Sequence, residues 1–358
     1  MESILKNIPS EFKGEIIYRE EACRICGHKS GKKISVIDYW DLRTSNLVKC
    51  SNCNLAQLDP MITHDETAIG CLAYYVKATL RNTKEKEAKN LLRNFRRGFL
   101  FGRSLEKQGI EPKKVLEMGP GSGYFLEGLK FVFPEIEITV MDVNKEVLQF
   151  NSEHHGYKPI ENILEKPLEH LENQFDLVVA RDVIEHVVDI KKVVENIQLY
   201  LSDQGLFHFT TPNGHEDLWK HYLTYNQKNK HSELLLNHVN YFDGKGLLDF
   251  LKEQAFEPLK YYTYKLKTTR RGRGWKVSEK LMSPVSQKLS SSLYANEKIK
   301  DLENFSFIKS EVLKSWYINK SRKMMTYIIS SYLHANPIRV SPELNVGHEI
   351  YGLFQVNK

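Results

Sequence analysis

The sequence predicts a mixed α/β protein in which a largely parallel sheet follows a small cysteine-rich segment. Two observations predict this class. From Lys113 onward, short β-branched runs alternate with amphipathic segments, which is typical of a parallel sheet flanked by helices. Before that point, the stretch 18–60 is rich in Cys, Gly, Asn and Asp and cannot fold on a large apolar core alone. A long insertion, 265–345, which is basic at first and is then expected to be helical, breaks the alternation before the final strand.

The composition is that of a globular protein with more than one domain. At roughly 150 residues per domain, 358 residues allow two or three domains. The chain is 41% hydrophobic and 27% charged, which excludes collagen-like, coiled-coil and wholly disordered classes. Its net charge of +6 is weak evidence for a nucleic-acid partner. The sequence lacks a signal-like start and any long apolar run, so we expect a soluble cytoplasmic protein without a membrane partner.

The elements of the α/β region follow from periodicity and from turn residues. A helix is expected over 79–108, where apolar residues recur among Lys, Arg and Glu. Strands are expected over 114–118, 137–142, 175–180, 206–211, 258–264 and 349–356. Helices are expected over 124–131, 145–153, 189–201 and 246–254. Gly205 is expected to stop the helix over 189–201.

Four of the five cysteines predict a metal site. They form two Cys-x-x-Cys pairs, Cys23 with Cys26 and Cys50 with Cys53. The spacing suits a ribbon whose two turns hold one tetrahedral Zn²⁺, and four thiolates leave no open position for catalysis. Gly27 and Asn54 follow the pairs, where such turns need positive φ. A redox or reduced-thiol role is the alternative for the pairs, and Cys71 is expected to be a small buried hydrophobe.

A glycine-rich loop and a later acid predict a nucleoside-containing cofactor. Gly119, Gly121 and Gly123 stand directly between a strand and a helix, where the backbone can turn sharply and approach a ligand. Asp142 ends the next strand, where a carboxylate can accept hydrogen bonds from both hydroxyls of a ribose. The alternative for Asp142 is a cap on the following helix. The two features together indicate an adenosine-bearing cofactor.

The order of the glycines, G-x-G-x-G after Glu117, differs from the G-x-G-x-x-G of dinucleotide sites. Over about 115–256 the sequence resembles class I S-adenosylmethionine-dependent methyltransferases. EMGPGSG and MDVN look like their first and second motifs, and FDLVVARDVIEHVVD and LYLSDQGLFHFTTPN look like their fourth-strand and fifth-strand signatures. NHVNYFDGKGLLDFLKEQAFE resembles the segment that follows in many small-molecule methyltransferases. The resemblance implies a Rossmann-like sheet of seven strands, the last antiparallel.

The resemblance also implies a cofactor site for S-adenosylmethionine. Its expected residues are Glu117, Gly119, Pro120, Gly121, Gly123, Asp142, Val143, Glu165 and Arg181. The glycines and the proline would pass under the methionine part of the cofactor, and Asp142 with Val143 would hold the ribose. Glu117 would steady the loop or the amino group. Glu165 would contact the adenine, and Arg181 would lie near the adenine or the methionine.

Three residues are candidates for catalysis. His238 is the expected general base, because one base suffices to deprotonate an acidic carbon or a hydroxyl. His186 is a candidate for substrate contact, with helix capping beside Glu185 as the alternative. Tyr241 is the third candidate, although a core position is the simpler interpretation. His238 could likewise be a satisfied histidine beneath a loop.

The insertion 265–345 must emerge at the edge of the sheet where ligands bind, and this predicts a substrate lid. Its basic start suits a phosphate or a carboxylate, with a solvated loop as the alternative. The basic residues and an adjacent tryptophan are Lys265, Lys267, Arg270, Arg271, Arg273, Lys276 and Trp275. The expected division of the chain is a zinc ribbon, a helical linker, a methyltransferase domain in two parts and the insertion, at 1–62, 63–112, 113–264 with 346–358, and 265–345.

Three functions are compatible with these features. The first is a methyltransferase for an anionic small molecule, such as a nucleotide-sugar or a biosynthetic intermediate, because similar ribbons precede methyltransferases of sugar and natural-product biosynthesis. The second is an RNA methyltransferase whose ribbon and arginines, among them Arg93, Arg96 and Arg97, follow a phosphate backbone. The third is a cofactor-binding sensor without catalysis. The sequence leaves the acceptor atom open among carbon, oxygen and nitrogen.

Overall fold

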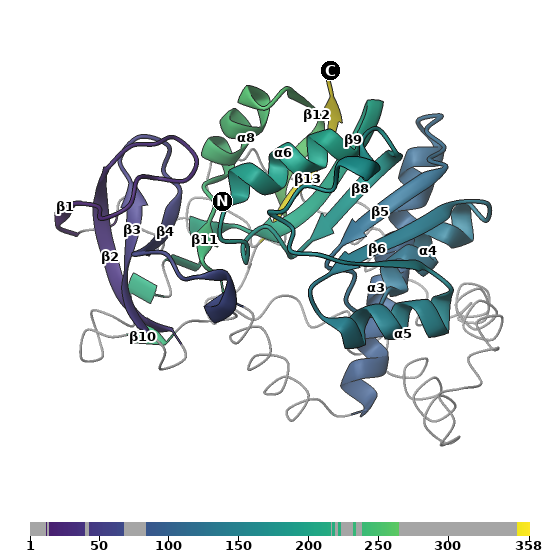
Figure 1. Ribbon diagram of the computed structural model, residues 1–358, viewed down its shortest axis with the longest axis horizontal. Helices are drawn as coiled ribbons and strands as arrows, with labels where there is room; N and C mark the ends of the chain where they lie inside the picture. The colour runs from purple at the N-terminus through teal and green to yellow at the C-terminus, as the bar shows by residue number, and fades with distance from the viewer. Residues whose placement is uncertain are drawn as a thin grey trace, which may run out of the picture.

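The computed structural model describes two sheets that lie side by side (Figure 1). The described residues are 12, 14–39, 43–67, 84–215, 217–218, 221–222, 232–233, 238–264 and 349–358. The insertion predicted over 265–345, with its basic start, and Cys71 lie outside these residues. In the described part of the chain, no helix is long and apolar enough to cross a bilayer.

The larger sheet has seven strands, in the order β12-β13-β9-β8-β5-β6-β7. These strands are β5 (Lys114–Met118), β6 (Glu137–Asp142), β7 (Lys158–Glu161), β8 (Phe175–Arg181), β9 (Leu201–Pro212), β12 (Phe256–Tyr264) and β13 (Glu349–Val356). Strands β5 to β9 run parallel, and β13 inserts antiparallel between β9 and β12. The predicted seven-stranded sheet with an antiparallel last strand is therefore confirmed.

Helices cover both faces of this sheet (Figure 1). They are α3 (Lys84–Glu106), α4 (Tyr124–Val132), α5 (Lys145–His155), α6 (Ile190–Tyr200) and α8 (Gly244–Glu253). Helices α3 and α4 cross closely, because a Cβ atom on Gly98 would lie 1.8 Å from Phe125 O and one on Gly128 would lie 1.9 Å from Phe95 O. One buried core lies beneath α3, α4 and α5, and a second lies beneath α6 and α8.

One sequence expectation is corrected in α6. The helix ends at Tyr200 and leads straight into β9 through Leu201, so Gly205 lies within β9 and does not stop the helix. Burial of Tyr200, whose hydroxyl accepts a hydrogen bond from Leu168 N (3.0 Å), fixes this end. Leu201 then pairs with Phe175 of β8. Tertiary contacts therefore end the helix before the glycine is reached.

The smaller sheet, here called the ribbon sheet, joins distant parts of the chain. Its strands are β1 (Ile16–Tyr18), β2 (Ser30–Tyr39), β3 (Arg43–Cys50), β4 (Ala56–Asp59), β10 (Ser232–Glu233) and β11 (Asn240–Tyr241). The short β11 pairs antiparallel with β4, and β10 pairs parallel with β2. The ribbon sheet is thus completed by segments that follow β9, a feature that local patterns did not predict. The predicted domain limits stay a prediction.

The cysteine turns of the ribbon share a buried cluster with α8. Cys23, Cys50 and Leu55 belong to the same buried cluster as Phe242 and Leu247. A Cβ atom on Gly246, in the first turn of α8, would lie 2.2 Å from Cys53 O. The cysteine turns therefore pack directly on the part of the chain that carries β11 and α8.

Candidate functional site

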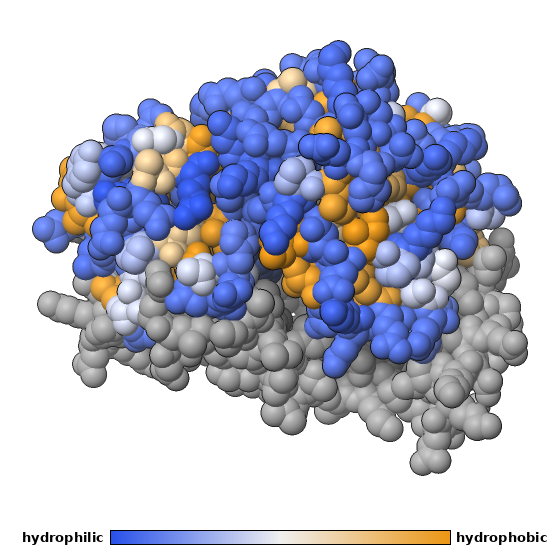
Figure 2. All heavy atoms as spheres, in the orientation of Figure 1, coloured by the Kyte–Doolittle hydropathy of each residue, from blue (hydrophilic) through white to orange (hydrophobic). Residues whose placement is uncertain are grey.

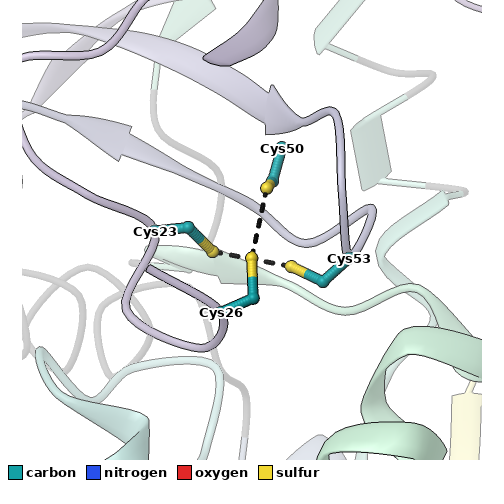
Figure 3. Close-up of side chains that lie close together, drawn as sticks. All are labelled: Cys23, Cys26, Cys50 and Cys53. Carbon is teal, nitrogen blue, oxygen red and sulfur yellow. Dashed lines mark hydrogen bonds between the residues drawn. The ribbon is translucent and has the colours of Figure 1, made fainter. Parts of the chain in front are cut away.

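The four ribbon cysteines converge on one point (Figure 3). All four sulfurs lie within 4.8 Å of one another, with Cys23 Sγ 3.5 Å from Cys53 Sγ and Cys26 Sγ 3.6 Å from Cys50 Sγ. Thiolates around a tetrahedral Zn²⁺, each about 2.3 Å from the ion, would be about 3.8 Å apart. The cluster therefore fits a four-thiolate metal site.

The surroundings of the cluster agree with this fit. Gly27 and Asn54 have φ values of 71° and 61°, as the sequence predicted for the two turns. The Cys50 thiolate and burial raise the pKa of Cys23 to about 11. The pKa of Cys50 is lowered because Cys23 and Cys53 donate hydrogen bonds to it. Metal binding must therefore displace the protons that the sulfurs otherwise share.

The glycine loop lies between β5 and α4, at the carboxyl edge of the large sheet. Gly119, Gly121 and Gly123 have φ values of 65°, 54° and 72°, a region that other residues enter only with strain. Apart from Gly121 itself and its two chain neighbours, no atom of the described residues lies within 4 Å of a Cβ built on Gly121, so open space adjoins this backbone in that part of the structure. Gly123 caps α4 without a side-chain hydrogen bond. The loop thus offers bare backbone and a helix N-terminus to a ligand.

Helix α5 holds the loop from beneath. Asn151 Nδ2 donates to Gly121 O (2.9 Å), and His155 Nε2 lies 3.0 Å from Ser122 O. The other ring nitrogen of His155 lies 3.3 Å from the carboxylate of Glu127, which also accepts from the Tyr157 hydroxyl. Sequence reasoning missed these supporting residues, because nothing in their spacing marks them.

Glu117 presents an unpaired acceptor just before the loop. The residue is 1% exposed, and its Oε2 atom has no hydrogen-bond partner among the described residues. Burial raises the pKa of Glu117 to about 8, although the Arg181 guanidinium opposes the shift. Arg181 stacks 4.1 Å over the Phe125 ring and donates to Asn94 Oδ1 (3.4 Å). A buried carboxylate without a partner suits a cationic ligand such as an ammonium group.

Asp142 ends β6, and Val143 after it is 50% exposed. Burial raises the pKa of Asp142, and its Oδ1 atom accepts from Asn144 N (2.8 Å). The cap of α5 is Asn144, whose side chain accepts from the amides of Glu146 and Val147. The alternative interpretation of Asp142 as the helix cap is therefore wrong, and its carboxylate remains available at the strand end.

Glu165 has structural contacts of its own. Its Oε1 atom accepts from Val188 N (2.9 Å) and Asp189 N (3.4 Å) and lies 3.4 Å from His64 Nε2. It lines a hollow of about 470 Å³ together with Thr63, His64, Asp65, Ile163, Lys166 and Lys192. The carboxylate thus secures the segment before α6, and its proposed contact with adenine stays a prediction.

A second cluster, here called the catalytic cluster, consists of Glu185, His186, Asp217 and His238. His238 Nδ1 lies 3.2 Å from Asp217 Oδ2, and the His186 and His238 rings lie 5.1 Å apart. Glu185 is 1% exposed; its Oε2 accepts from Thr211 Oγ1 (3.0 Å), and its Oε1 has no partner among the described residues. Burial, aided by Asp182 and Asp217, raises the pKa of Glu185 well above its usual range.

The cluster brings together two of the three predicted catalytic residues and adds one that the sequence did not reveal. Because Asp217 holds one ring nitrogen of His238, the other is left to accept a proton. His186 does not cap a helix, since the N-cap of α6 is Asp189. Donor atoms of Glu185, His186 and His238 also lie within 4.8 Å of one another, so these three could hold a divalent cation.

Tyr241 lies behind the cluster. It is 2% exposed, and its hydroxyl pairs with His221 Nε2 (3.0 Å). Its ring centroid lies 6.4 Å from that of His238, and burial raises the pKa of its phenol well above the usual range. Such surroundings suit a group that supports the cluster more than one that exchanges a proton.

The glycine loop and the catalytic cluster adjoin at the carboxyl edge of the large sheet. A Cβ atom on Gly119 would lie 2.6 Å from Val183 Cγ2, so the segment that leads to Glu185 packs against the glycine loop. Figure 2 shows apolar residues gathered near the carboxyl ends of the central strands, within an otherwise mostly hydrophilic face. Arg93 and Arg97 of α3 lie near this edge, because Arg93 is close enough to Arg181 at the end of β8 to feel its charge. Burial lowers the pKa of Arg93, and the charges of Arg97 and Arg181 lower it further.

Part of the chain matches a family of known proteins. Residues 85–261 match the family described as Methyltransferase domain. The chain is similar to malonyl-acyl-carrier-protein O-methyltransferase of Bacillus anthracis, with 26% identity over 132 residues, which is 36% of this chain and 46% of that relative. It is also similar to ubiquinone biosynthesis O-methyltransferase of Histophilus somni, with 26% identity over 123 residues, 32% of this chain and 51% of the relative.

The chain spans about half the length of these curated relatives. Among solved structures, the YcgJ protein of Bacillus subtilis aligns with a TM-score of 0.40 and 12% identity, over 72% of this chain and 98% of that one.

Proposed function

Since residues 85–261 belong to the methyltransferase domain family, we propose that the protein is an S-adenosylmethionine-dependent methyltransferase that acts on an anionic small molecule. One observation carries the proposal. The glycine loop, with open space at Gly121, lies against the segment that leads to the catalytic cluster. A cofactor cradle and a proton acceptor thus adjoin at the carboxyl edge of the sheet, where ligands of such sheets bind.

The residues of the loop fit this cofactor. S-adenosylmethionine supplies a methyl group that its sulfonium has already activated. The loop backbone and the bare N-terminus of α4 would bind the methionine part, and the buried Glu117 carboxylate would accept hydrogen bonds from its ammonium group. Asp142, with Val143 exposed beside it, would hold the ribose hydroxyls. Arg181 would lie near the methionine carboxylate.

The Asp217–His238 pair would supply the base. Asp217 orients the imidazole and stabilises its protonated form, so His238 Nε2 can take a proton from the acceptor hydroxyl or acidic carbon. His186 and Glu185 would line the acceptor site beside it. Tyr241, whose hydroxyl pairs with His221 Nε2, would pack behind the cluster and hold it in position.

The acceptor class is inferred from charge and from the relatives. Arg93, Arg97 and Arg181 bring positive charge to this edge, and the basic start of the insertion would add to it. One relative is described as acting on a malonyl group that an acyl-carrier protein holds, and another belongs to ubiquinone biosynthesis. These names support an anionic or carrier-bound biosynthetic intermediate, with a nucleotide-sugar as a further member of the class.

The ribbon would bind a structural Zn²⁺ through Cys23, Cys26, Cys50 and Cys53. Four thiolates close the coordination shell, so the ion would stabilise the ribbon and take no part in methyl transfer.

The proposed activity can be tested with methyl-labelled S-adenosylmethionine and an extract of host metabolites. Small molecules, RNA and protein are then separated, and label is counted in each fraction. Label in the small-molecule fraction that survives nuclease treatment and is lost in His238→Gln would support the proposal. Label in RNA would replace it with the RNA methyltransferase. Cofactor binding without label in any fraction would favour the sensor function.

A further inference from the structure

Two buried side-chain amides connect the cysteine turns to the segment that carries Glu185. Gln57 of β4 and Asn240 of β11 are 0% and 2% exposed, and Gln57 Nε2 donates to Asn240 Oδ1 (2.8 Å). On the ribbon side, Gln57 Oε1 accepts from Arg24 N (3.2 Å). On the other side, Asn240 Nδ2 donates to Ile184 O (3.3 Å) and Val187 O (2.6 Å). These hydrogen bonds form one continuous chain, here called the amide relay.

The relay permits only one orientation of each amide. Asn240 Nδ2 faces two carbonyl oxygens, which only a donor can satisfy. Its Oδ1 atom must then face Gln57, which must present its amide nitrogen. Gln57 Oε1 is thereby turned toward the amide of Arg24. Rotation of either amide would leave buried polar groups unpaired, so the relay specifies a single arrangement of its two ends.

Each end of the relay lies at a functional group. Arg24 stands between Cys23 and Cys26 in the first cysteine turn. At the other end, Val239 N and Asn240 N donate to Glu185 O (2.9 and 3.1 Å). Asn240 therefore holds the backbone on both sides of Glu185. Because His238 lies only two residues before Asn240 in the chain, a shift of Asn240 would move two members of the catalytic cluster.

We infer that Gln57 and Asn240 are positioning residues that couple the metal-bound state of the ribbon to the geometry of the catalytic cluster. The inference rests on the proposed function only in taking this cluster to be the site of catalysis. The coupling itself concerns the backbone of 184–187 and 238–240. With metal bound, the first cysteine turn is fixed and the relay holds Glu185 and His238 in register. Loss of the metal lets the backbone at Arg24 move, and the hydrogen bonds of Asn240 to Ile184 O and Val187 O then weaken as well.

Hydrogen exchange measured by mass spectrometry tests the coupling without any need for a substrate. The key variant is Gln57→Glu, whose ionised carboxylate keeps an acceptor for Arg24 N and turns an oxygen instead of a donor toward Asn240 Oδ1. Because burial favours the protonated acid, whose hydroxyl still donates, the variant is compared with the wild type at the highest pH at which both stay folded. The matched control is Val48→Ala, which truncates a fully buried side chain on β3, directly opposite Gln57. This substitution removes no polar group of the relay. Zinc content, exchange rates and affinity for S-adenosylhomocysteine are measured for each protein.

We expect Gln57→Glu to retain its zinc and to exchange faster in peptides 182–189 and 238–242, with peptides of the glycine loop unchanged. Wild-type protein stripped of zinc by a chelator should show the same faster peptides. Once an acceptor is known, kcat of Gln57→Glu should fall roughly tenfold, the effect of about one lost buried hydrogen bond, at unchanged cofactor affinity.

Three results would overturn the inference. These are unchanged exchange in 182–189 and 238–242, the same acceleration in Val48→Ala, and acceleration confined to the ribbon strands. If Gln57→Glu loses its zinc, Asn240→Asp replaces it. That variant changes no residue of the cysteine turns. It must raise the hydrogen-exchange rate of 182–189 without raising that of 23–26. If the protein methylates no acceptor, the proposed function fails, whereas the exchange data still decide the coupling.

Discussion

His238 Nδ1 lies 3.2 Å from Asp217 Oδ2, and both side chains are almost completely withdrawn from solvent. An imidazole held in this way presents its second nitrogen in a fixed direction, as a general base requires. The pair joins a segment that follows β9 with the one that leads into β11, and thus connects the large sheet with the ribbon sheet.

Replacement of His238 or Asp217 tests this pair. His238→Gln should lower kcat by about 10²-fold or more, the usual contribution of a general base, and leave affinity for S-adenosylhomocysteine unchanged. Asp217→Asn should also lower kcat, because an amide can hold the ring in the wrong tautomer. Turnover and calorimetry are the measurements. A His238→Gln enzyme that turns over at the wild-type rate would rule out this base.

The glycine loop can be tested with three alanine variants that share a positive φ. Gly109→Ala and Gly121→Ala have open space around the new Cβ atom, so each should lose only about 1 kcal/mol of stability through strain. Gly121→Ala alone should weaken cofactor binding, because its methyl group enters the space proposed for the ligand. Gly119→Ala should be the least stable, since its Cβ meets Val183 at 2.6 Å. Equal cofactor affinity in Gly109→Ala and Gly121→Ala would argue against the cradle.

Asp142→Ala should weaken cofactor binding by roughly 1–3 kcal/mol, because the ribose hydroxyls would lose their buried partner. The neighbouring Asn144→Ala is the control. It removes the cap of α5 and should lower the free energy of unfolding by about 1 kcal/mol. Calorimetry and chemical denaturation separate the two effects. Unchanged affinity in Asp142→Ala would refute the ribose contact.

Glu117 predicts a pH dependence of stability in the cofactor-free protein. Burial raises its pKa to about 8, whereas a glutamic acid in an unfolded chain ionises near about pH 4.3. Between these values the folded state keeps a proton that the unfolded state has lost, so the free energy of unfolding falls as the pH rises. In Glu117→Gln this fall should be smaller. At pH 8 the free energy of unfolding of the variant should exceed that of the wild type by ~1 kcal/mol or more. Denaturation at several pH values is the measurement, and parallel profiles for the two proteins would contradict it.

Fresh, reduced protein should contain one zinc ion per chain, and its removal should lower the unfolding temperature, because the ribbon depends on its metal. Cys26→Ser should lose the ion. Cys71→Ser is the matched control, since this cysteine lies outside the two Cys-x-x-Cys pairs of the sequence. Metal analysis that finds no zinc would refute the site.

The sequence alone was sufficient wherever the physical cause is local. Two Cys-x-x-Cys pairs place thiolates on turns, glycines between a strand and a helix need positive φ, and alternating patterns specify a parallel sheet. For these features the interacting groups are near neighbours in the chain, so their spacing carries the information. The positive-φ glycine loop and the convergence of the four ribbon cysteines were predicted in this way, whereas the roles of Asp142 and His238 stay predictions.

The tertiary structure decided what depends on distant partners. Gln57 and Asn240 are 183 residues apart, and neither has a local pattern that marks it. Asp217 looks like any acid in the sequence until folding brings it to His238. Burial without a partner, as for Glu117 and Glu185, is likewise a property of the packed molecule. Sequence spacing specifies which groups can meet nearby, whereas only packing determines which distant groups meet and which polar atoms remain unpaired.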